Sequence, residues 1–365
     1  MIARFTGLVL ALIAAMAGPV RAQDKLLNIY NWSDYIADRT VPDFTKETGI
    51  KVNYDVYDSN EVLEAKLLAG NSGYDLVVPS AMPYLARQIE AGVYRKIDKA
   101  KLKNYGNLDP QILAAAANAD PGNEYGVPYM WGTTGLGYNV AKVKAALGPD
   151  APLDSWKLLF DPANARKLQG CGIALLDSAQ DVFPAALVYL GRDPASHDPD
   201  DLDAAAKALD AIRPYVRKFN SSEYINDLAN GDICLAFGYS GDVVQAKARA
   251  AEAKNRVEIA YAIPKEGAMM WIDMMAIPKD APHADAALAF VDYILRPWVA
   301  AAISNAVAYA NPNAKATKLV KPAIRNDPNI YPPAAVRARL FFDKPATPSF
   351  ERARTRAWTR VKTGG

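Results

Sequence analysis

Histidine and cysteine are scarce in this sequence, whose 365 residues include only two of each. His197 and His283 both stand in proline-flanked polar segments, and neither is near a cysteine or another histidine along the chain. Zinc sites and Ser-His or Cys-His catalytic pairs are built from clusters of such residues. We therefore expect no metal site, no cofactor and no enzymatic activity.

A surplus of positive charge and long hydrophobic runs are missing as well. Apart from the first 22 residues, which carry two Arg and no acid, the chain has 40 basic and 40 acidic side chains. Nucleic-acid-binding proteins usually carry a basic surface, so we expect no nucleic acid as a partner. After these residues no stretch approaches the roughly 18 uncharged apolar residues of a membrane-spanning helix, which predicts a soluble protein.

The N-terminal segment, residues 1–22, has the pattern of a secretory signal peptide. Arg4 precedes an apolar run over Gly7–Met16, and Val20-Arg21-Ala22 places small residues at the cleavage positions. A positive start, a short apolar stretch and small residues before the cut are the three parts of such a signal. We expect cleavage after Ala22 and export to the periplasm.

Export would place the two cysteines in an oxidising compartment. Cys171 and Cys234 could pair there as a disulfide that closes a loop of about 60 residues. Two buried free thiols are the alternative, because the sequence alone does not give the distance between them.

The first part of the exported chain alternates strand and helix patterns. Such alternation predicts an α/β fold, with a parallel sheet covered by helices. Ligands bind these sheets beyond the carboxyl ends of the strands, which selects Asn31–Tyr35 and Pro79-Ser80. The predicted strands are residues 26–30, 50–56 and 74–80, and the predicted helices are residues 41–49, 60–70 and a segment that ends near residue 91.

The length of the chain and one unusual segment predict two lobes. A chain of this length exceeds what one hydrophobic core normally supports. Residues 129–139 are rich in aromatic residues and glycine, and they predict a strand that crosses between lobes. Farther on, residues 257–263 and 271–277 are predicted strands, and residues 281–295 are a predicted helix.

Acids stand close to aromatic residues at three places: Trp32–Tyr35, Tyr239 with Asp242, and Trp271 with Asp273. A buried ammonium needs a carboxylate, and an aromatic face attracts it by about 0.5 to 2 kcal/mol. Trp271 and Asp273 would share one face of a strand, because residues two apart point the same way. The three places together predict a site for a linear diamine, although any one pair is more often a core ring beside a surface acid.

Longer motifs then identify a resemblance. They are, in chain order, Tyr30–Ile36, Val77–Ser80, Pro128–Thr134, Tyr224–Asp232, Ile263–Gly267 and Tyr331–Pro333. In these motifs the chain resembles the periplasmic polyamine-binding proteins of ABC importers, with the putrescine-binding branch nearest, over about Leu26 to Lys362.

The resemblance implies the fold of a type II periplasmic binding protein, with two hinged α/β lobes that each have a central sheet flanked by helices. By resemblance the chain crosses between lobes near Thr133, Trp271 and Ala310. It assigns residues 23–133 and 271–310 to lobe 1 and residues 134–270 and 311–365 to lobe 2.

The resemblance also implies a ligand site between the lobes. Asp242 and Asp273 would neutralise one ammonium, and Gln180 or Asp181 would receive the other together with polar groups of lobe 1. The family usually has Glu in the segment of Gln180-Asp181, often Trp at Tyr239, and Phe at Trp271, so the ligand class stays intact while the exact ligand stays open. The implied ligand-binding residues are Trp32, Ser33, Asp34, Tyr35, Ser80, Gln180, Asp181, Ser221 or Ser222, Tyr239, Asp242, Trp271, Asp273 and Tyr309.

The expected ligand is putrescine or a relative such as cadaverine, agmatine or spermidine. The expected partner is an ABC permease in the inner membrane, and the expected state is a monomer. A polyamine-sensing receptor is an alternative that uses the same fold, as is a binder of amino acids, sugars or ferric ion. A secreted hydrolase is a further alternative, but it would need a base near Ser33, Ser80 or Ser240, and no suitable histidine is available.

Overall fold

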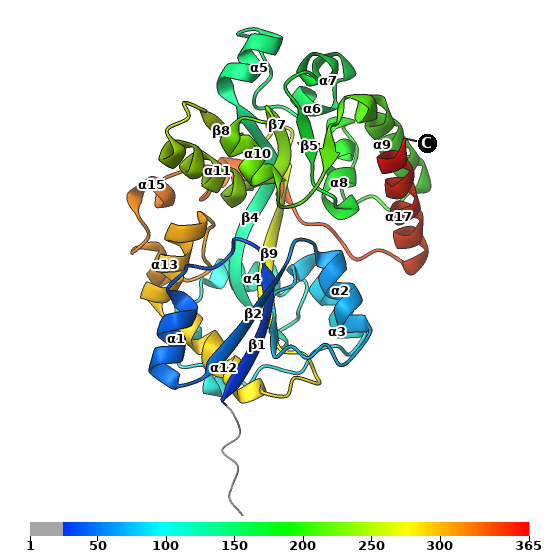
Figure 1. The fold of residues 1–365 in the computed structure, drawn as a ribbon. Coiled ribbons are helices and arrows are strands. Elements are labelled where there is room, and N and C mark those ends of the chain that lie inside the picture. Colours follow the sequence, from blue (N-terminus) through cyan, green and yellow to red (C-terminus); the bar gives the residue numbers. More distant parts are fainter. Residues whose placement is uncertain (1–24, 365) are drawn as a thin grey trace, which may run out of the picture.

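A computed structural model of the chain describes residues 25–364. The predicted signal peptide lies outside these residues. Figure 1 shows two lobes, one above the other, with strands β4 (Gly126–Asn139) and β9 (Ala268–Ala276) running between them. We call the part that holds residues 26–116 and 284–307 the first lobe, and the part that holds residues 140–253 and 348–363 the second lobe.

The strands form one connected path of hydrogen-bonded pairs through both lobes. The path runs β2-β1-β3-β9-β4-β7-β5-β6, while β10 pairs with β9 and β8 pairs with β4. The remaining strands are β1 (Leu26–Trp32), β2 (Lys51–Tyr57), β3 (Leu76–Val77), β5 (Ile173–Leu175), β6 (Lys218–Phe219), β7 (Leu235–Tyr239), β8 (Ile259–Ala262) and β10 (Leu340–Phe341).

The helices flank these strands in both lobes, as Figure 1 shows. Those between β1 and β4 are α1 (Thr40–Thr48), α2 (Asn60–Leu68), α3 (Ala86–Glu90) and α4 (Pro110–Ala116). From β4 to β9 the chain forms α5 (Val140–Leu147), α6 (Lys157–Phe160), α7 (Pro162–Leu168), α8 (Ala179–Tyr189), α9 (Pro199–Ile212), α10 (Tyr224–Asn230) and α11 (Ser240–Ala253). After β9 come α12 (Ala284–Ile294), α13 (Pro297–Val307), α14 (Ala314–Thr317), α15 (Pro322–Arg325), α16 (Ala334–Arg337) and α17 (Pro348–Thr363).

The predicted α/β fold is confirmed, but the sheet is mixed rather than parallel. β1 pairs in parallel with β2 and β3, and β5 pairs in parallel with β6 and β7, as strand–helix alternation predicts. β9 returns from much later in the chain and lies antiparallel to both β3 and β4. Pairing between strands so far apart in sequence leaves no local pattern from which it could have been predicted.

Strand β4 changes partners halfway along its length. Its first part pairs with β9 up to Thr133, and its second part pairs with β7 from Thr134 onward. The strand is buried along all 14 residues. Backbone hydrogen bonds of this one buried strand therefore join it to β9 on one side of the change and to β7 on the other. The change of partner falls between Thr133 and Thr134.

The hydrophobic core is divided between the lobes. One large cluster contains buried residues from 136 to 268 together with Ala357, Trp358 and Val361 of α17. Two further clusters combine residues from 27 to 131 with residues from 271 to 310, and one of them includes Ile330. A small fourth cluster packs Ala316 and Val320 against α13.

Among the described residues, none of the helices taken singly has both the length and the apolar composition of a membrane span.

The two cysteines form a disulfide, which confirms the predicted pair over the alternative of free thiols. Cys171 and Cys234 are 63 residues apart in sequence, and their Cα atoms lie 5.4 Å apart. Cys234 is fully buried immediately before β7, and Cys171 lies just ahead of β5. The bond therefore ties together the starts of two neighbouring strands of the second lobe.

Candidate functional site

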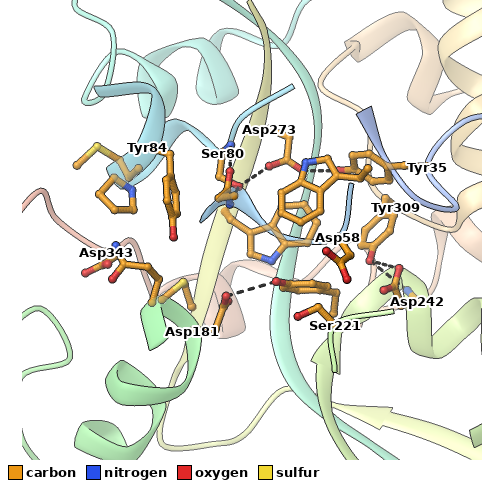
Figure 2. A pocket seen from close by; sticks show the side chains of 18 of the residues that line it. Tyr35, Asp58, Ser80, Tyr84, Asp181, Ser221, Asp242, Asp273, Tyr309 and Asp343 are labelled. Carbon is orange, nitrogen blue, oxygen red and sulfur yellow. Dashed lines mark hydrogen bonds between the residues drawn. The ribbon is translucent and has the colours of Figure 1, made fainter. Parts of the chain in front are cut away.

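A pocket lies between the two lobes, where loops that follow the strands meet. About 640 Å³ of it is not filled by atoms, a volume that includes space open to solvent. Figure 2 shows side chains from both lobes pointing into it. Its lining residues are Trp32, Ser33, Tyr35, Asp58, Asn60, Ser80, Met82, Pro83, Tyr84, Gln180, Asp181, Ser221, Tyr239, Asp242, Met269, Trp271, Asp273, Tyr309 and Asp343.

The predicted ligand-binding residues converge on this pocket, with one exception. Ser221 lines it and its alternative Ser222 does not; all the others line it except Asp34, whose carboxylate forms an ion pair with Arg249 at 2.7 Å. Asp34 has a left-handed backbone conformation, with φ at 53°. This turn points the Asp34 side chain away from its neighbours Ser33 and Tyr35, a change of direction that the sequence pattern did not reveal.

Strand ends explain why residues so distant in sequence meet here. Trp32 is the last residue of β1, and Tyr239 is the last residue of β7. Asp181 and Asp242 lie in the first turns of α8 and α11, the helices that follow β5 and β7. Ligand sites beyond the carboxyl ends of strands are the rule in open α/β sheets.

Asp273 is a buried carboxylate that is held by both of its oxygens. It lies on β9, where it is 3% exposed. The Ser80 hydroxyl donates to Oδ1 at 2.6 Å, and the Tyr35 hydroxyl donates to Oδ2 at 2.8 Å. Burial raises the pKa of Asp273 to about 7, although the two hydrogen bonds act to lower it. The carboxylate is therefore fixed in direction and short of a positive charge.

Asp242 is held in the same way from the second lobe. The Tyr309 hydroxyl donates to Oδ1 at 2.6 Å, and the Tyr224 hydroxyl donates to Oδ2 at 2.8 Å. Burial raises the pKa of Asp242 to about 6, again against the effect of these hydrogen bonds. Because Tyr309 comes from the first lobe, the geometry of Asp242 depends on both lobes.

Figure 2 shows a third carboxylate, Asp181, between Asp242 and Asp343, which lies at the opposite end of the pocket. The Thr134 hydroxyl donates to its Oδ1 at 3.0 Å, and the Tyr239 hydroxyl donates to Oδ2 at 3.3 Å. Burial raises the pKa of Asp181 above its usual range. Asp181 and its neighbour Gln180 both line the pocket, so the structure brings in both members of the predicted pair.

Aromatic rings form a continuous wall along the pocket. Successive ring centroids are 6.3 Å apart from Trp32 to Tyr239, 5.7 Å from Tyr239 to Trp271 and 5.3 Å from Trp271 to Tyr309. Tyr309 then meets Tyr35 at 5.1 Å. The rings meet edge to face, an arrangement that is favourable for aromatic pairs. Such a wall offers apolar surface and negative ring faces to a ligand.

Several lining residues were missed by the sequence analysis. Asp58 follows β2 directly, so the rule of strand ends could have selected it. Asn60 exchanges two hydrogen bonds with Ser80, both at 3.0 Å, and thereby fixes the Ser80 hydroxyl that contacts Asp273. Tyr84 lies in a short π-helix over Ala81–Leu85, and Asp343 comes shortly after β10. No spacing in the sequence connects either of them with the predicted residues.

The charges in the pocket have one sign. Every charged side chain that lines it is an aspartate, namely Asp58, Asp181, Asp242, Asp273 and Asp343. Within residues 25–364 no group of three or more His, Cys, Asp or Glu side chains is placed to hold a metal ion. Carboxylates spread along an aromatic-walled pocket match a cation whose charges are also spread out and joined by apolar atoms.

The fold and the pocket together define the class of two-lobed solute-binding proteins. Residues 40–332 match the bacterial extracellular solute-binding protein family, and the chain belongs to that family. This membership confirms the prediction that the chain is a binding protein and not an enzyme.

Known relatives cover almost the whole chain. It is 56% identical over 360 residues to the putrescine-binding periplasmic protein SpuD of Pseudomonas aeruginosa, which covers 98% of each chain. It is also 56% identical over 355 residues to the putrescine-binding periplasmic protein PotF of Escherichia coli, covering 97% of this chain and 96% of PotF. Among solved structures, a putative spermidine/putrescine ABC transporter from Listeria monocytogenes superposes with a TM-score of 0.82, at 33% identity, over 93% of this chain and 99% of that one. The resemblance predicted from the motifs is thereby confirmed.

Proposed function

We propose that this chain is the periplasmic substrate-binding component of an ABC importer, and that it binds putrescine or a related linear polyamine in the pocket between its lobes. The observation that carries this proposal is the pocket itself, whose charged side chains are all acids and whose wall is a row of aromatic rings. The names of its relatives, two of them putrescine-binding periplasmic proteins, support the same ligand class and the same compartment.

The physical account follows from the hydrogen bonds of the carboxylates. Asp242 and Asp273 each accept two bonds from hydroxyl groups, which orient the oxygens but bring no positive charge. An ammonium beside them would supply that charge and donate further hydrogen bonds. Charge-assisted hydrogen bonds of this kind are roughly twice as strong as neutral ones.

The proposal includes two lobes that close on the ligand and an ABC permease that receives it. The division into residues 23–133 plus 271–310 and residues 134–270 plus 311–365 stays a prediction. The packing of Ala316 and Val320 against α13 favours one change, which is to move the segment around α14 to the first lobe.

A calorimetric titration of residues 23–365 tests this function. Putrescine, cadaverine, agmatine and spermidine are compared with neutral sugars and amino acids of similar size. At least one polyamine should bind with a dissociation constant in the micromolar range or below, and the sugars and amino acids should not bind. Binding of a sugar or an amino acid in place of every polyamine would refute the proposal.

The variant Asp273→Asn tests the assigned site. It removes a buried charge that would otherwise pair with an ammonium, so polyamine affinity should fall by the equivalent of about 2 to 5 kcal/mol. Asp285→Asn is the matched control, because the Asp285 side chain is 89% exposed and pairs only with Lys101 at the surface. Equal affinities for Asp273→Asn and the control would show that the ligand binds elsewhere.

A further inference from the structure

Among the described residues, two ion pairs join a side chain of the first lobe to one of the second. One is Asp34 with Arg249 of α11, the helix that also carries Asp242. The other is Arg87 of α3 with Glu351 of α17, whose nearest nitrogen and oxygen atoms lie 3.4 Å apart. Because these partners belong to different lobes, the second pair can form only when the lobes are together.

Arg87 is held in place by its own lobe. Its Nε and Nη2 donate to the two carboxylate oxygens of Glu64 at 2.6 and 2.5 Å, and its guanidinium lies 4.4 Å from the centre of the Tyr84 ring. The remaining nitrogen, Nη1, is the one that approaches Glu351. The planar fork of an arginine can serve two acids in this way, with its direction fixed by the first of them.

Glu351 is held in the same manner by the second lobe. Its Oε1 accepts a hydrogen bond from Arg354 at 2.8 Å, and the Arg354 side chain is only 4% exposed. The helix that carries both residues is fixed to this lobe, since the Trp358 ring packs edge to face against Phe219 at 5.3 Å. The acid therefore has a set direction before it meets the first lobe.

The pair stands one layer outside the lining of the pocket. Figure 2 shows Tyr84 and Asp343 at the same end of the cavity. Arg87 lies over the ring of Tyr84, and Arg354 approaches Asp343 to 3.5 Å. Neither Arg87 nor Glu351 lines the pocket itself. The ion pair thus joins the structures behind the two walls of this end without touching a ligand.

The surroundings favour this pair over an ordinary surface pair. Exposed ion pairs contribute little, partly because two long side chains must be ordered to form them. The Arg87 and Glu351 side chains are only 26% and 23% exposed, and each is already ordered by a partner in its own lobe. Closing the lobes therefore gains the interaction with little further loss of side-chain entropy.

We propose that Arg87 and Glu351 form a latch that holds the lobes together at the Tyr84 end of the pocket and slows the release of the ligand. Both are positioning residues, because they act on the ligand only through the lobes. A ligand enters the open protein, in which the pair is absent, so the latch sets the rate of release and not the rate of entry. The inference rests on the proposed function, because it names what holds the same pocket closed.

Stopped-flow kinetics on a double-mutant cycle test the latch. The proteins are the unmodified chain, Arg87→Gln, Glu351→Gln and the variant with both changes. The ligands are putrescine and spermidine, and the signal is the fluorescence of Trp32 and Trp271, which line the pocket. The matched control is Arg192→Gln, which breaks an ion pair with Asp201 inside the second lobe.

Each single variant should release the ligand about 2- to 5-fold faster, with the association rate and the control unchanged. The double variant should release it no faster than the faster single variant, because both changes remove the same interaction. In urea unfolding of the ligand-free protein the two changes should instead be additive, since the pair is absent from the open form. Arg87→Lys replaces Arg87→Gln if that variant does not fold, because lysine keeps the charge beside Glu64 but lacks the fork that serves two acids.

Three results would overturn the latch. They are release from the single variants as slow as from the control, rates of release that multiply in the double variant, and an effect confined to association. Each would leave the proposed function standing, because a polyamine would still bind. Failure of both amines to bind the unmodified chain would refute the binding of these polyamines, and the latch with it.

Discussion

Binding of a polyamine to this pocket should release protons, because its carboxylates hold protons that a cation would displace. The pKa of Asp273 is raised to about 7 and that of Asp242 to about 6 by burial. Amines with pKa values near that of lysine, about 10.4, stay charged throughout this range. An ammonium beside each carboxylate favours the ionised form, so the bound state carries fewer protons than the empty one.

The size of the effect follows from these two values. At pH 7 about half a proton should leave Asp273 on binding, and at pH 6 about 1.4 protons should leave the two groups together. Polyamine affinity should therefore rise with pH, by a factor of about 1,000 between pH 5 and pH 8. Asp273→Asn should remove the larger share of both the release and the pH dependence.

Calorimetry in buffers of different ionisation enthalpy measures the released protons directly. The apparent binding enthalpy should change with the buffer, with a slope of about 1.4 protons at pH 6. The same titrations from pH 5 to pH 8 give the affinity profile. Equal enthalpies in all buffers, together with a flat affinity profile, would refute the reasoning, since the carboxylates would then already be ionised in the empty protein.

Stability of the empty protein should follow the same protons with a definite sign. In the unfolded chain both aspartates titrate near pH 4, so between pH 4 and pH 7 the folded state binds more protons than the unfolded state. The contribution of these groups to the free energy of unfolding is therefore fully present below about pH 4. It is lost as the pH rises through the folded values of about 6 and 7. The melting temperature should accordingly gain more from ligand at pH 8 than at pH 5.

Two further predictions concern a glycine next to the pocket and the disulfide. A Cβ on Gly241 would lie 2.5 Å from the Tyr309 ring, so Gly241→Ala should displace that ring. The Tyr309 hydroxyl would then no longer donate to Asp242, and polyamine binding should weaken about tenfold or more. Gly106→Ala, where a Cβ meets nothing within 4 Å, should bind normally in the same titration. The double variant Cys171→Ala/Cys234→Ala removes the disulfide that links residues 63 apart in sequence. Urea unfolding should show a free energy of unfolding lower by about 4 kcal/mol. Polyamine affinity should stay unchanged, because neither cysteine lines the pocket. An unfolding midpoint equal to that of the unmodified chain would contradict the second prediction.

Much of the site could be predicted because it follows local rules. Trp32 ends β1 and was selected by the rule of strand ends, and Trp271 and Asp273 were selected by their spacing of two residues on β9. Tyr239 ends β7, but it was selected by its closeness to Asp242, since no strand was predicted there. Asp34 shows the limit of that reasoning. It stands between two lining residues, but its left-handed conformation turns its carboxylate toward Arg249.

The remaining features depend on contacts that no local pattern encodes. Asp343 reaches the pocket only because β10 pairs with β9, and the sheet is mixed only because β9 returns beside β3. The hydroxyl groups of Tyr224 and Tyr309, which orient Asp242, come from different lobes. Spacing along the chain predicts which residues share a strand or a helix turn, but it does not predict which tyrosine from another lobe will meet a given carboxylate.

The construction around α11 connects the charge of the pocket to the position of the lobes. The first turn of this helix carries Asp242, and its exposed side carries Arg249, which pairs with Asp34 of the first lobe at 2.7 Å. Gln245, between them on the same helix, donates to the Val307 carbonyl of α13 at 3.1 Å. The contacts that join α11 to the first lobe are therefore the ones that bring Asp242 into the cavity that already holds Asp273. Burying these carboxylates without a cation is unfavourable, because burial is the largest cause of the raised pKa of each of them. On the proposed function, a polyamine removes that penalty only when the lobes are together, so occupancy and closure are coupled through the aspartates themselves.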